Sequence, residues 1–401
     1  MGSIVVPRAG EFPRSADVVI IGGGVIGCAT AFYATEGALD TVVLERRDGL
    51  ATLTTAASEE CFRAQFTEPE NVRMMLESIS VFERFADVVR IPNYNIDIHQ
   101  RGYLFLTADE TGPELLRERV RTQQLAGLFT VELLDGDEVR QRFPFVGPLV
   151  TAATFGSRDG WLSAHELSYG FAKGSSALFA LQTAATGIRV DSHGVAGVAT
   201  TRGEISTRCV VVAAGPFSGV VASWAGVHLP LSVVRRQKVI LGDAPDVPQD
   251  APMTVDQDTG VYWRPEVSGA ALGWALPEDP SEPLERVPTD WTFPAVVLEG
   301  AARLVPFWGQ VAERLTRDNV FLDAGQYTCT PDGKPIIGPC SDVPGLYFNL
   351  GYSGHGIMAS PGGARLLVDL IQARHHDSES AFSQTRFAEG QARVSAEQAV
   401  L

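Results

Sequence analysis

A glycine-rich turn near the beginning of the chain constrains the fold more than any other sequence feature. The run Asp17–Ile21 has the β-branched composition of a buried parallel strand. GGGVIG follows, with Gly22, Gly24 and Gly27 at GxGxxG spacing, and the small and apolar residues 28–34 are typical of a helix. The first glycine permits a tight turn, the second admits a pyrophosphate, and the third lets helix and strand pack closely. The sequence therefore predicts a Rossmann-like βαβ unit that binds a dinucleotide.

Glu45, the acidic residue at the end of the next strand, narrows the choice of dinucleotide. Residues 41–45 form a second buried strand, and Glu45 lies at its end. A carboxylate there accepts hydrogen bonds from ribose hydroxyls and repels a 2′-phosphate, which favours FAD or NAD over NADP. Arg46 and Arg47 come next and could shift that preference.

Two later segments favour FAD over NAD. CVVVAAGP, at residues 209–216, is an apolar strand whose Ala-Ala-Gly end brings backbone close to the dinucleotide a second time. Residues 345–350 form another strand, and GYSGHG at 351–356 leads into a helix expected at about residues 359–373. A second glycine-rich turn between strand and helix offers N–H groups to the polar edge of a flavin ring, whereas NAD needs only one such turn.

Composition and charge limit the function classes. The 401 residues suggest two or three lobes at about 150 residues per domain. The net charge of -16 disfavours binding to nucleic acid or to anionic membranes. The five cysteines are odd in number and none has CxxC spacing, so we expect no disulfide framework, no metal site and a cytoplasmic location. Residues 1–16 lack the apolar run of a signal peptide, and glycines interrupt the apolar stretch 18–33.

Hydrophobic periodicity predicts the remaining elements. Between residues 190 and 215, alternation and glycine turns predict a β-ribbon that returns to the dinucleotide domain. Residues 230–280 are rich in proline, valine and aromatics, which favours a second, more antiparallel sheet. The polar segment after His376 is expected to be loosely ordered. A strand is expected at residues 104–107, and helices at residues 70–90, 113–142, 165–181 and 295–315.

Taken together, these motifs resemble the D-amino-acid oxidase superfamily of FAD oxidoreductases. The matching stretches are DVVIIGGGVIGCATAFYATEG, RGYLFLTAD, GVAGVATTRGEISTRCVVVAAGPFS, TPDGKPIIG and GLYFNLGYSGHGIMASPGGARLLVDLI, which span residues 17–376. The chain is most similar to the branch that holds sarcosine oxidase, the dimethylglycine and sarcosine dehydrogenases and the L-proline dehydrogenase β subunit.

The resemblance implies an α/β (α+β) fold in two domains. A Rossmann-like FAD-binding domain of the GR2 type would comprise residues 15–95, 145–230 and 320–376. A mainly antiparallel substrate domain would comprise residues 96–144 and 231–319, and residues 377–401 would form a C-terminal tail.

The resemblance also implies an activity and its partners. The activity is hydride transfer from a carbon that bears an amine, expected to be a secondary amine or an amino acid, to flavin N5, with an imine as product. Oxidation of a 2-hydroxy acid or polyol phosphate is one alternative, and a phosphate would require clustered cations such as Arg235, Arg236 and Lys238. Another is an FAD-carrying subunit of a hetero-oligomeric dehydrogenase, and a third is a non-catalytic flavin-binding module. The expected partners are the amine, O2 or another electron acceptor, and a partner subunit or a second copy of the chain.

Seventeen residues match cofactor-binding positions of that superfamily. They belong to the two glycine-rich turns, the Ala-Ala-Gly strand end, the strand that carries the acid, and the segment before Arg63. They are Gly22, Gly24, Val25, Ile26, Gly27, Glu45, Arg46, Ala57, Ser58, Ala214, Gly215, Gly351, Gly354, His355, Gly356, Ile357 and Met358.

Four side chains match catalytic positions of the sarcosine oxidase branch. Arg63 matches an arginine that lies over the flavin, and His355 lies in the turn at its pyrimidine end, where donors stabilise the reduced ring. Tyr262 and Tyr327 match active-site tyrosines. Each has a structural alternative, namely a surface ion pair for the arginine, a turn residue for the histidine and core packing for the tyrosines. One of the acids Glu59–Glu60 could also bind a substrate ammonium.

The chain departs from the branch at four positions. Gly325 replaces the cysteine that anchors flavin covalently, which implies non-covalent FAD. Gly273 replaces the lysine that helps activate oxygen, which weakens an oxidase assignment. Met358 and Phe66 replace the lysine and arginine that bind the substrate carboxylate. The substrate therefore lacks that carboxylate, or another group such as Arg264 holds it, because an unpaired carboxylate in a dry pocket is unfavourable.

Overall fold

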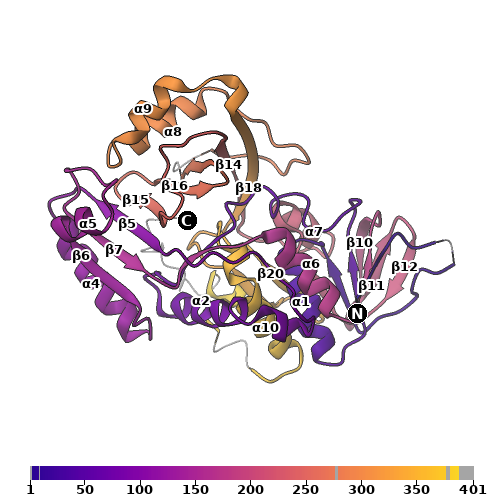
Figure 1. The fold of residues 1–401 in the computed structure, drawn as a ribbon. Helices are drawn as coiled ribbons and strands as arrows, with labels where there is room; N and C mark the ends of the chain where they lie inside the picture. Colours follow the sequence, from indigo (N-terminus) through magenta and orange to yellow (C-terminus); the bar gives the residue numbers. More distant parts are fainter. Residues whose placement is uncertain (1, 9, 276–278, 376–379, 388–401) are drawn as a thin grey trace.

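The structure is a computed structural model, and it describes residues 2–8, 10–275, 279–375 and 380–387. Two large sheets organise the molecule, one of eight strands and one of seven. In Figure 1 the eight-stranded sheet extends from the left to the top, and the seven-stranded sheet lies from the centre to the right. A three-stranded antiparallel ribbon projects on the right, made of β10 (Ala185–Asp191), β11 (Gly194–Thr200) and β12 (Gly203–Ser206). The ribbon confirms the hairpin pattern expected after residue 190.

The seven-stranded sheet holds the predicted βαβ unit and both glycine-rich turns. All neighbouring strands pair in parallel except the last two, which are antiparallel. In order across the sheet the strands are β1 (Ser3–Val5), β9 (Leu178–Ala180), β3 (Thr41–Leu44), β2 (Val18–Ile21), β13 (Val210–Val212), β20 (Leu346–Leu350) and β19 (Ile336–Pro339). Because β1 pairs with β9, the chain enters this sheet before residue 15, where the sequence placed the start of the domain.

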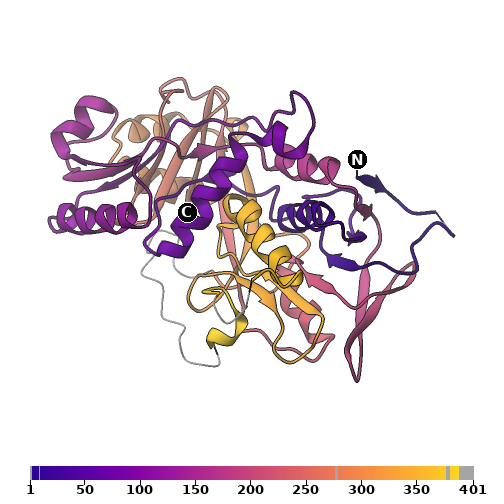
Figure 2. The same ribbon diagram turned by 90° about the horizontal axis from the view of Figure 1, so that it is seen from below.

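Both faces of this sheet are covered, which explains the uninterrupted apolar strands. Val18 and Ile20 face a core formed with the helices α1 (Val25–Glu36), α6 (Ala164–Gly174) and α10 (Gly356–Ile371). Val19 and Ile21 face a second core, formed with the ribbon and α7 (Ser218–Ser223). The helix α2 (Pro69–Phe82) lies alongside α10, as Figure 2 shows, and adds to the first core.

The eight-stranded sheet is the second, mainly antiparallel sheet that the sequence predicts. Its neighbouring strands are antiparallel except β15 and β5, which are parallel. In order the strands are β18 (Val320–Cys329), β14 (Ser232–Leu241), β17 (Gly269–Trp274), β16 (Val261–Glu266), β15 (Met253–Asp256), β5 (Tyr103–Thr107), β7 (Ala152–Gly156) and β6 (Val131–Asp135). The helices α8 (Phe293–Ala302) and α9 (Phe307–Arg314) cover one face. The sheet includes β7 and β18, which the predicted boundaries at residues 145 and 320 assign to the FAD domain.

Several predicted helices are shorter or divided. The stretch 113–142 contains α4 (Gly112–Leu125), then β6, then α5 (Gly136–Arg142), because β6 pairs with β7 and Asp135 forms a capping box that starts α5. The stretch 165–181 ends its helix at Gly174 and continues as β9. Residues 70–90 divide into α2 and α3 (Phe85–Val89), residues 295–315 into α8 and α9, and the last long helix begins at Gly356 rather than at 359.

The part of the tail that the structure describes is anchored, contrary to expectation. Phe382 is buried, and Arg386 pairs with the buried Asp332 at 2.8 Å. The backbone N–H of Ile337 in β19 also donates to the carbonyl of Phe382. The rest of that prediction lies outside the described residues.

Within the described ranges, no helix combines the length and apolar character needed to cross a membrane. Those residues also contain no cluster of His, Cys, Asp and Glu suited to a metal ion.

Candidate active site

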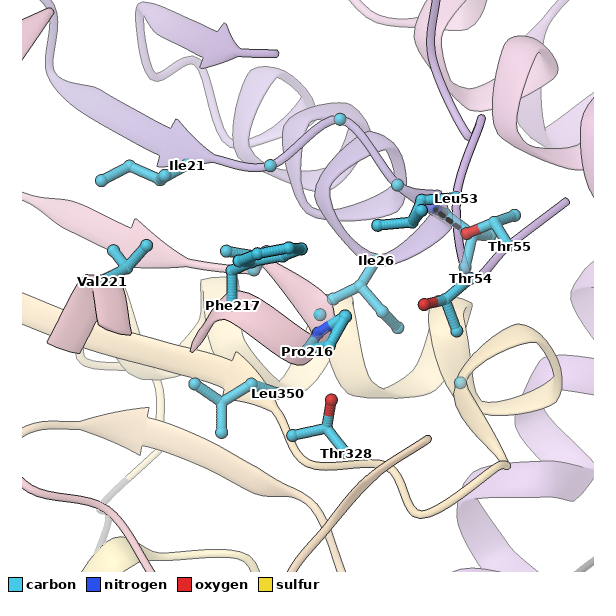
Figure 3. Close-up of a pocket in the computed structure, with 18 of the residues that line it drawn as sticks. Ile21, Ile26, Leu53, Thr54, Thr55, Pro216, Phe217, Val221, Thr328 and Leu350 are labelled. Carbon is cyan, nitrogen blue, oxygen red and sulfur yellow. Dashed lines mark hydrogen bonds between the residues drawn. The ribbon is translucent and has the colours of Figure 1, made fainter. Parts of the chain in front are cut away.

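A cavity of about 340 Å³ lies at the carboxyl ends of the strands β2, β13 and β20. This volume is in the usual range for a small-molecule or cofactor site. Figure 3 shows its walls, with the first glycine-rich turn above, Phe217 and Pro216 in the middle, and Leu350 and Thr328 below. A parallel sheet commonly binds its ligand at this edge, because the strand-to-helix turns meet there.

The three motif glycines serve two different purposes. A Cβ on Gly22 would overlap the carbonyl of Ala213, and one on Gly27 would overlap the carbonyl of Gly22. These two positions therefore permit strand and helix to pack. Gly24 is different, since its Cβ would find only the Thr55 hydroxyl, at 3.4 Å. Gly24 lies at the N-terminal end of α1 and lines the cavity, so its surface remains open to a phosphate.

Glu45 is held in place by the backbone around the motif. Its carboxylate accepts hydrogen bonds from the N–H groups of Gly23 and Arg47, both at 2.8 Å. These bonds leave lone pairs for ribose hydroxyls. Arg46 lies 4.0 Å over the Phe217 ring and pairs with Glu285 at 2.9 Å. The carboxylate and the aromatic platform suit the nucleoside end of FAD.

The second glycine-rich turn forms the opposite end of the cavity. Gly351 and Gly354 have positive φ angles of 75° and 99°, and both line the cavity. A Cβ on Gly354 would lie 2.6 Å from the Tyr327 ring, so the glycine lets this tyrosine pack against the turn. The donor-rich turn expected at the flavin ring is therefore present, with a predicted active-site tyrosine against it.

A second, much smaller cavity of about 20 Å³ adjoins this end. Its lining includes Ala57, Glu59, Tyr262 and Gly325. Both cavities share four lining residues, Thr54, Ser58, Gln326 and Tyr327. The small cavity thus lies directly beyond the end of the large one that the flavin ring would occupy.

Tyr262 explains why glycine stands at position 273. The two residues are cross-strand partners, and a Cβ on Gly273 would overlap the tyrosine hydroxyl. Lys238, on the other side of Gly273 in the sheet, lines the small cavity and donates to the Ser58 carbonyl at 2.7 Å. A cation therefore reaches this cavity from the neighbouring strand, although position 273 itself has no room for a side chain.

Arg63 and His355 lie close together beneath the site. Arg63 is fully buried, donates to the carbonyl of Gln65, and lies 3.9 Å over the Phe66 ring, so it is not part of a surface ion pair. The rings of His355 and Phe66 pack edge to face, with 4.9 Å between their centroids. Burial, with a smaller effect from Arg63, lowers the pKa of His355 to about 3, so the ring is neutral at pH 7. Among the described residues, its buried Nε2 has no hydrogen-bond partner.

The structure brings most of the predicted site residues to one place. Thirteen of the predicted cofactor residues line the large cavity: Gly22, Gly24, Val25, Ile26, Glu45, Arg46, Ser58, Ala214, Gly215, Gly351, Gly354, Gly356 and Ile357. Tyr327 joins them, Ala57 and Tyr262 line the small cavity, and Gly27, Arg63 and His355 line neither. Met358 points into the core on the buried face of α10 and also lines neither cavity, so its cofactor role, like the other roles, stays a prediction.

Sequence reasoning missed several lining residues. Phe217 and Trp224 follow the Ala-Ala-Gly strand end, and Leu53, Thr54 and Thr55 precede the segment of Arg63. The loop 51–55 lacks any motif of its own, and only its position between two matched segments pointed to it.

Comparison with known proteins agrees with this geometry. The family model described as "FAD dependent oxidoreductase" (DAO) matches residues 17–370. FAD-dependent oxidoreductase domain-containing protein 1 of Bos taurus is 28% identical, over 90% of this chain and 82% of that protein. Human mitochondrial sarcosine dehydrogenase is 27% identical over 94% of this chain but only 42% of its own length. The crystal structure of L-proline dehydrogenase from P. horikoshii has a TM-score of 0.84 at 23% identity and covers 95% of this chain and 100% of that one.

The open surface at Gly24, the oriented carboxylate of Glu45 and the turn at residues 351–354 provide the cradle that FAD requires. The chain belongs to the DAO family of FAD-dependent oxidoreductases, and FAD is its cofactor.

Proposed function

We propose that the protein oxidises an amine or amino acid, with a secondary amine as the reacting group. A hydride would leave the carbon next to nitrogen, and the resulting iminium would lose a proton to give an imine. Bound FAD would supply the hydride acceptor, at N5 of its ring. The observation that carries the proposal is the junction of the two cavities, which share Thr54, Ser58, Gln326 and Tyr327. At about 20 Å³ the small cavity has room for little more than one polar group, so a substrate would also extend into the adjoining end of the large cavity.

The residues around the small cavity can hold a polar substrate, and they include one carboxylate, that of Glu59. Burial raises the pKa of Tyr262 and of Tyr327, so both phenols stay protonated and can donate hydrogen bonds. His355 is neutral. These groups would orient a substrate and exclude water. The names of the relatives, sarcosine dehydrogenase and dimethylglycine dehydrogenase among them, support the choice of an amine.

The phosphate alternative has less support. It requires at least two clustered cations, and although Arg235 pairs with Asp279 at 2.7 Å, Arg236 and Lys238 both line the small cavity. The buried carboxylate of Glu59 lines the same cavity, however, and would repel a phosphate. Non-covalent FAD, a cytoplasmic location and the nature of the electron acceptor also remain proposals; Gly325 supports the first, and five free cysteines support the second.

The test is anaerobic reduction of the purified flavoprotein by sarcosine, L-proline, other amino acids, polyamines and 2-hydroxy acids. We expect one of the amines or amino acids to bleach the visible flavin absorbance rapidly. Admission of air then separates an oxidase from a dehydrogenase, because only an oxidase reoxidises rapidly. Bleaching by 2-hydroxy acids alone would replace the amine proposal with its alternative.

A further inference from the structure

The small cavity contains a buried carboxylate that has no hydrogen-bond partner. Glu59 is only 7% exposed and lines this cavity. Among the described residues, neither of its carboxylate oxygens accepts a hydrogen bond. A buried carboxylate in this state is strongly unfavourable unless a cation or donor reaches it.

The neighbouring cations do not fill this need. Arg264 approaches Glu59 only at 3.9 Å, because its guanidinium donates to the Glu59 backbone carbonyl at 3.1 Å and pairs with Glu266 at 2.7 Å. Glu60 lies 3.8 Å from the same guanidinium. Lys238 donates to the Ser58 carbonyl, and no ion pair within 4 Å joins it to a described acid. The carboxylate of Glu59 is therefore attracted by these cations but hydrogen-bonded to neither.

The same cavity also contains a cation without an acidic partner. Arg236 lines it and lies 5.5 Å over the Tyr327 ring. Its guanidinium donates to the backbone carbonyl of Arg235, and its buried Nε has no partner among the described residues. The described chain places no acid within ion-pair distance of it, whereas the adjacent Arg235 is paired with Asp279. A planar guanidinium in this state is suited to a carboxylate.

We propose that Glu59 and Arg236 are the two specificity-determining anchors of the substrate, which is therefore a small zwitterionic amino acid. Glu59 receives the charged nitrogen, and Arg236 receives the carboxylate. A hydride leaves only a neutral amine, so the ammonium first gives its proton to the Glu59 carboxylate, whose pKa burial raises. This inference rests on the proposed amine oxidation and narrows its substrate class. The carboxylate would then bind at Arg236 and not at the positions expected from the sequence. Phe66 and Met358 are buried and apolar, and Arg264 is already paired with Glu266.

The test uses matched ligands that differ by one charge. Sarcosine and L-proline carry both charges, dimethylamine and pyrrolidine lack the carboxylate, and methoxyacetate and tetrahydrofuran-2-carboxylate lack the ammonium. The common D- and L-amino acids extend the zwitterionic set. Binding to the FAD-loaded protein is read from the shift of the flavin spectrum. We expect the best zwitterion to bind at least about tenfold more tightly than its two partial analogues.

Variants assign each preference to one residue. In Glu59→Gln, the amino acid should no longer bind more tightly than the analogue that lacks the ammonium. In Arg236→Gln, it should no longer bind more tightly than the analogue that lacks the carboxylate. Glu59→Asp and Arg236→Lys keep the charges and should retain part of each preference, which guards against misfolding of the neutral variants. Glu60→Gln and Arg235→Gln, neighbours outside the cavity, should leave both preferences unchanged.

The outcomes separate this inference from the proposed function. Efficient flavin reduction by an amine that lacks a carboxylate, with no gain from the zwitterion, would support amine oxidation and overturn the two-anchor site. Zwitterion binding that depends on Glu59 and Arg236 but never reduces the flavin would support the anchors and refute amine oxidation. A protein that binds no zwitterion, or variants that keep both preferences, would refute the anchors.

Discussion

The two adjoining cavities are built in different ways. The large cavity is formed largely by backbone at strand ends, where Gly24, Gly215 and Gly356 leave the chain open to a ligand. The small cavity, which we propose as the substrate site, is formed by side chains such as Glu59, Arg236 and Tyr262, which come from a loop and two strands. Backbone cradles tolerate little change in shape, whereas side-chain pockets can change chemistry on the same sheet. We therefore expect changes in the first to abolish FAD loading and changes in the second to alter catalysis alone.

The largest effect should follow from crowding the motif turn. In Gly27→Val, the new side chain would overlap the Gly22 carbonyl, which should destabilise the protein by about 3 kcal/mol and prevent FAD loading. The flavin-to-protein absorbance ratio and the melting temperature measure this. Gly24→Ala is the matched variant, because its Cβ has room and should weaken FAD binding without lowering the melting temperature of the apoprotein. Equal loss of stability in both variants would contradict the division of roles between the glycines.

A change in the small cavity should leave FAD binding unchanged. In Gly273→Ala, the added Cβ would displace the Tyr262 hydroxyl. Because Tyr262 would then no longer position the substrate, flavin reduction should be slower on the order of tenfold to a hundredfold. FAD content should not change. Stopped-flow reduction of the holo-protein by its best amine measures the rate. Gly309→Ala, where a Cβ meets open space, is the control. Loss of FAD from Gly273→Ala would show that the two cavities are not independent.

A moderate effect is expected at Glu45, the acid predicted to bind the ribose. Glu45→Gln removes the charge that accepts from Gly23 and Arg47 and faces the cavity, so FAD affinity should fall about tenfold. Fluorescence titration of the apoprotein with FAD measures the affinity. Asp48→Asn, an exposed neighbour outside the cavity, should bind FAD as the unmodified protein does. If both variants bound equally, Glu45 would not contact the ribose.

At neutral pH the smallest effect is expected at His355, whose contribution to stability changes only as the pH falls. Burial lowers its pKa from the usual 6.5 to about 3, so between these values the unfolded chain binds more protons than the folded one. Above pH 6.5 the neutral His355 therefore costs the folded protein no stability. Below that pH the free energy of unfolding falls, by at most about 1.4 kcal/mol per pH unit from this residue. Unfolding of His355→Asn by denaturant from pH 7 to pH 4 should show a shallower decline than the unmodified protein. Parallel declines would mean that His355 is protonated in the folded state.

The cofactor half of the site could be predicted because its signals are local. Gly22, Gly24, Gly27 and Glu45 occur in one βαβ unit, and the turn at residues 351–354 directly follows its strand. Phe217 had no comparable signal, because an aromatic residue after a strand end is equally typical of a core. The strand β6 was mistaken for helix because its five residues lie between two amphipathic helices, and only its pairing with β7 identifies it.

By itself, the sequence determined the Rossmann-like unit, the FAD site and the family, because chain-local spacing sets the backbone geometry that a dinucleotide needs. Only the tertiary structure decided which charged side chains around the small cavity lack an ion-pair partner among the described residues. Arg235 and Arg236 are adjacent in sequence, yet one is paired with Asp279 and the other faces the small cavity beside Tyr327. Glu59 and Glu60 differ in the same way, since only Glu59 lines that cavity. Alternation along a strand or turn sends neighbouring side chains in opposite directions, and the partners they meet come from distant parts of the chain.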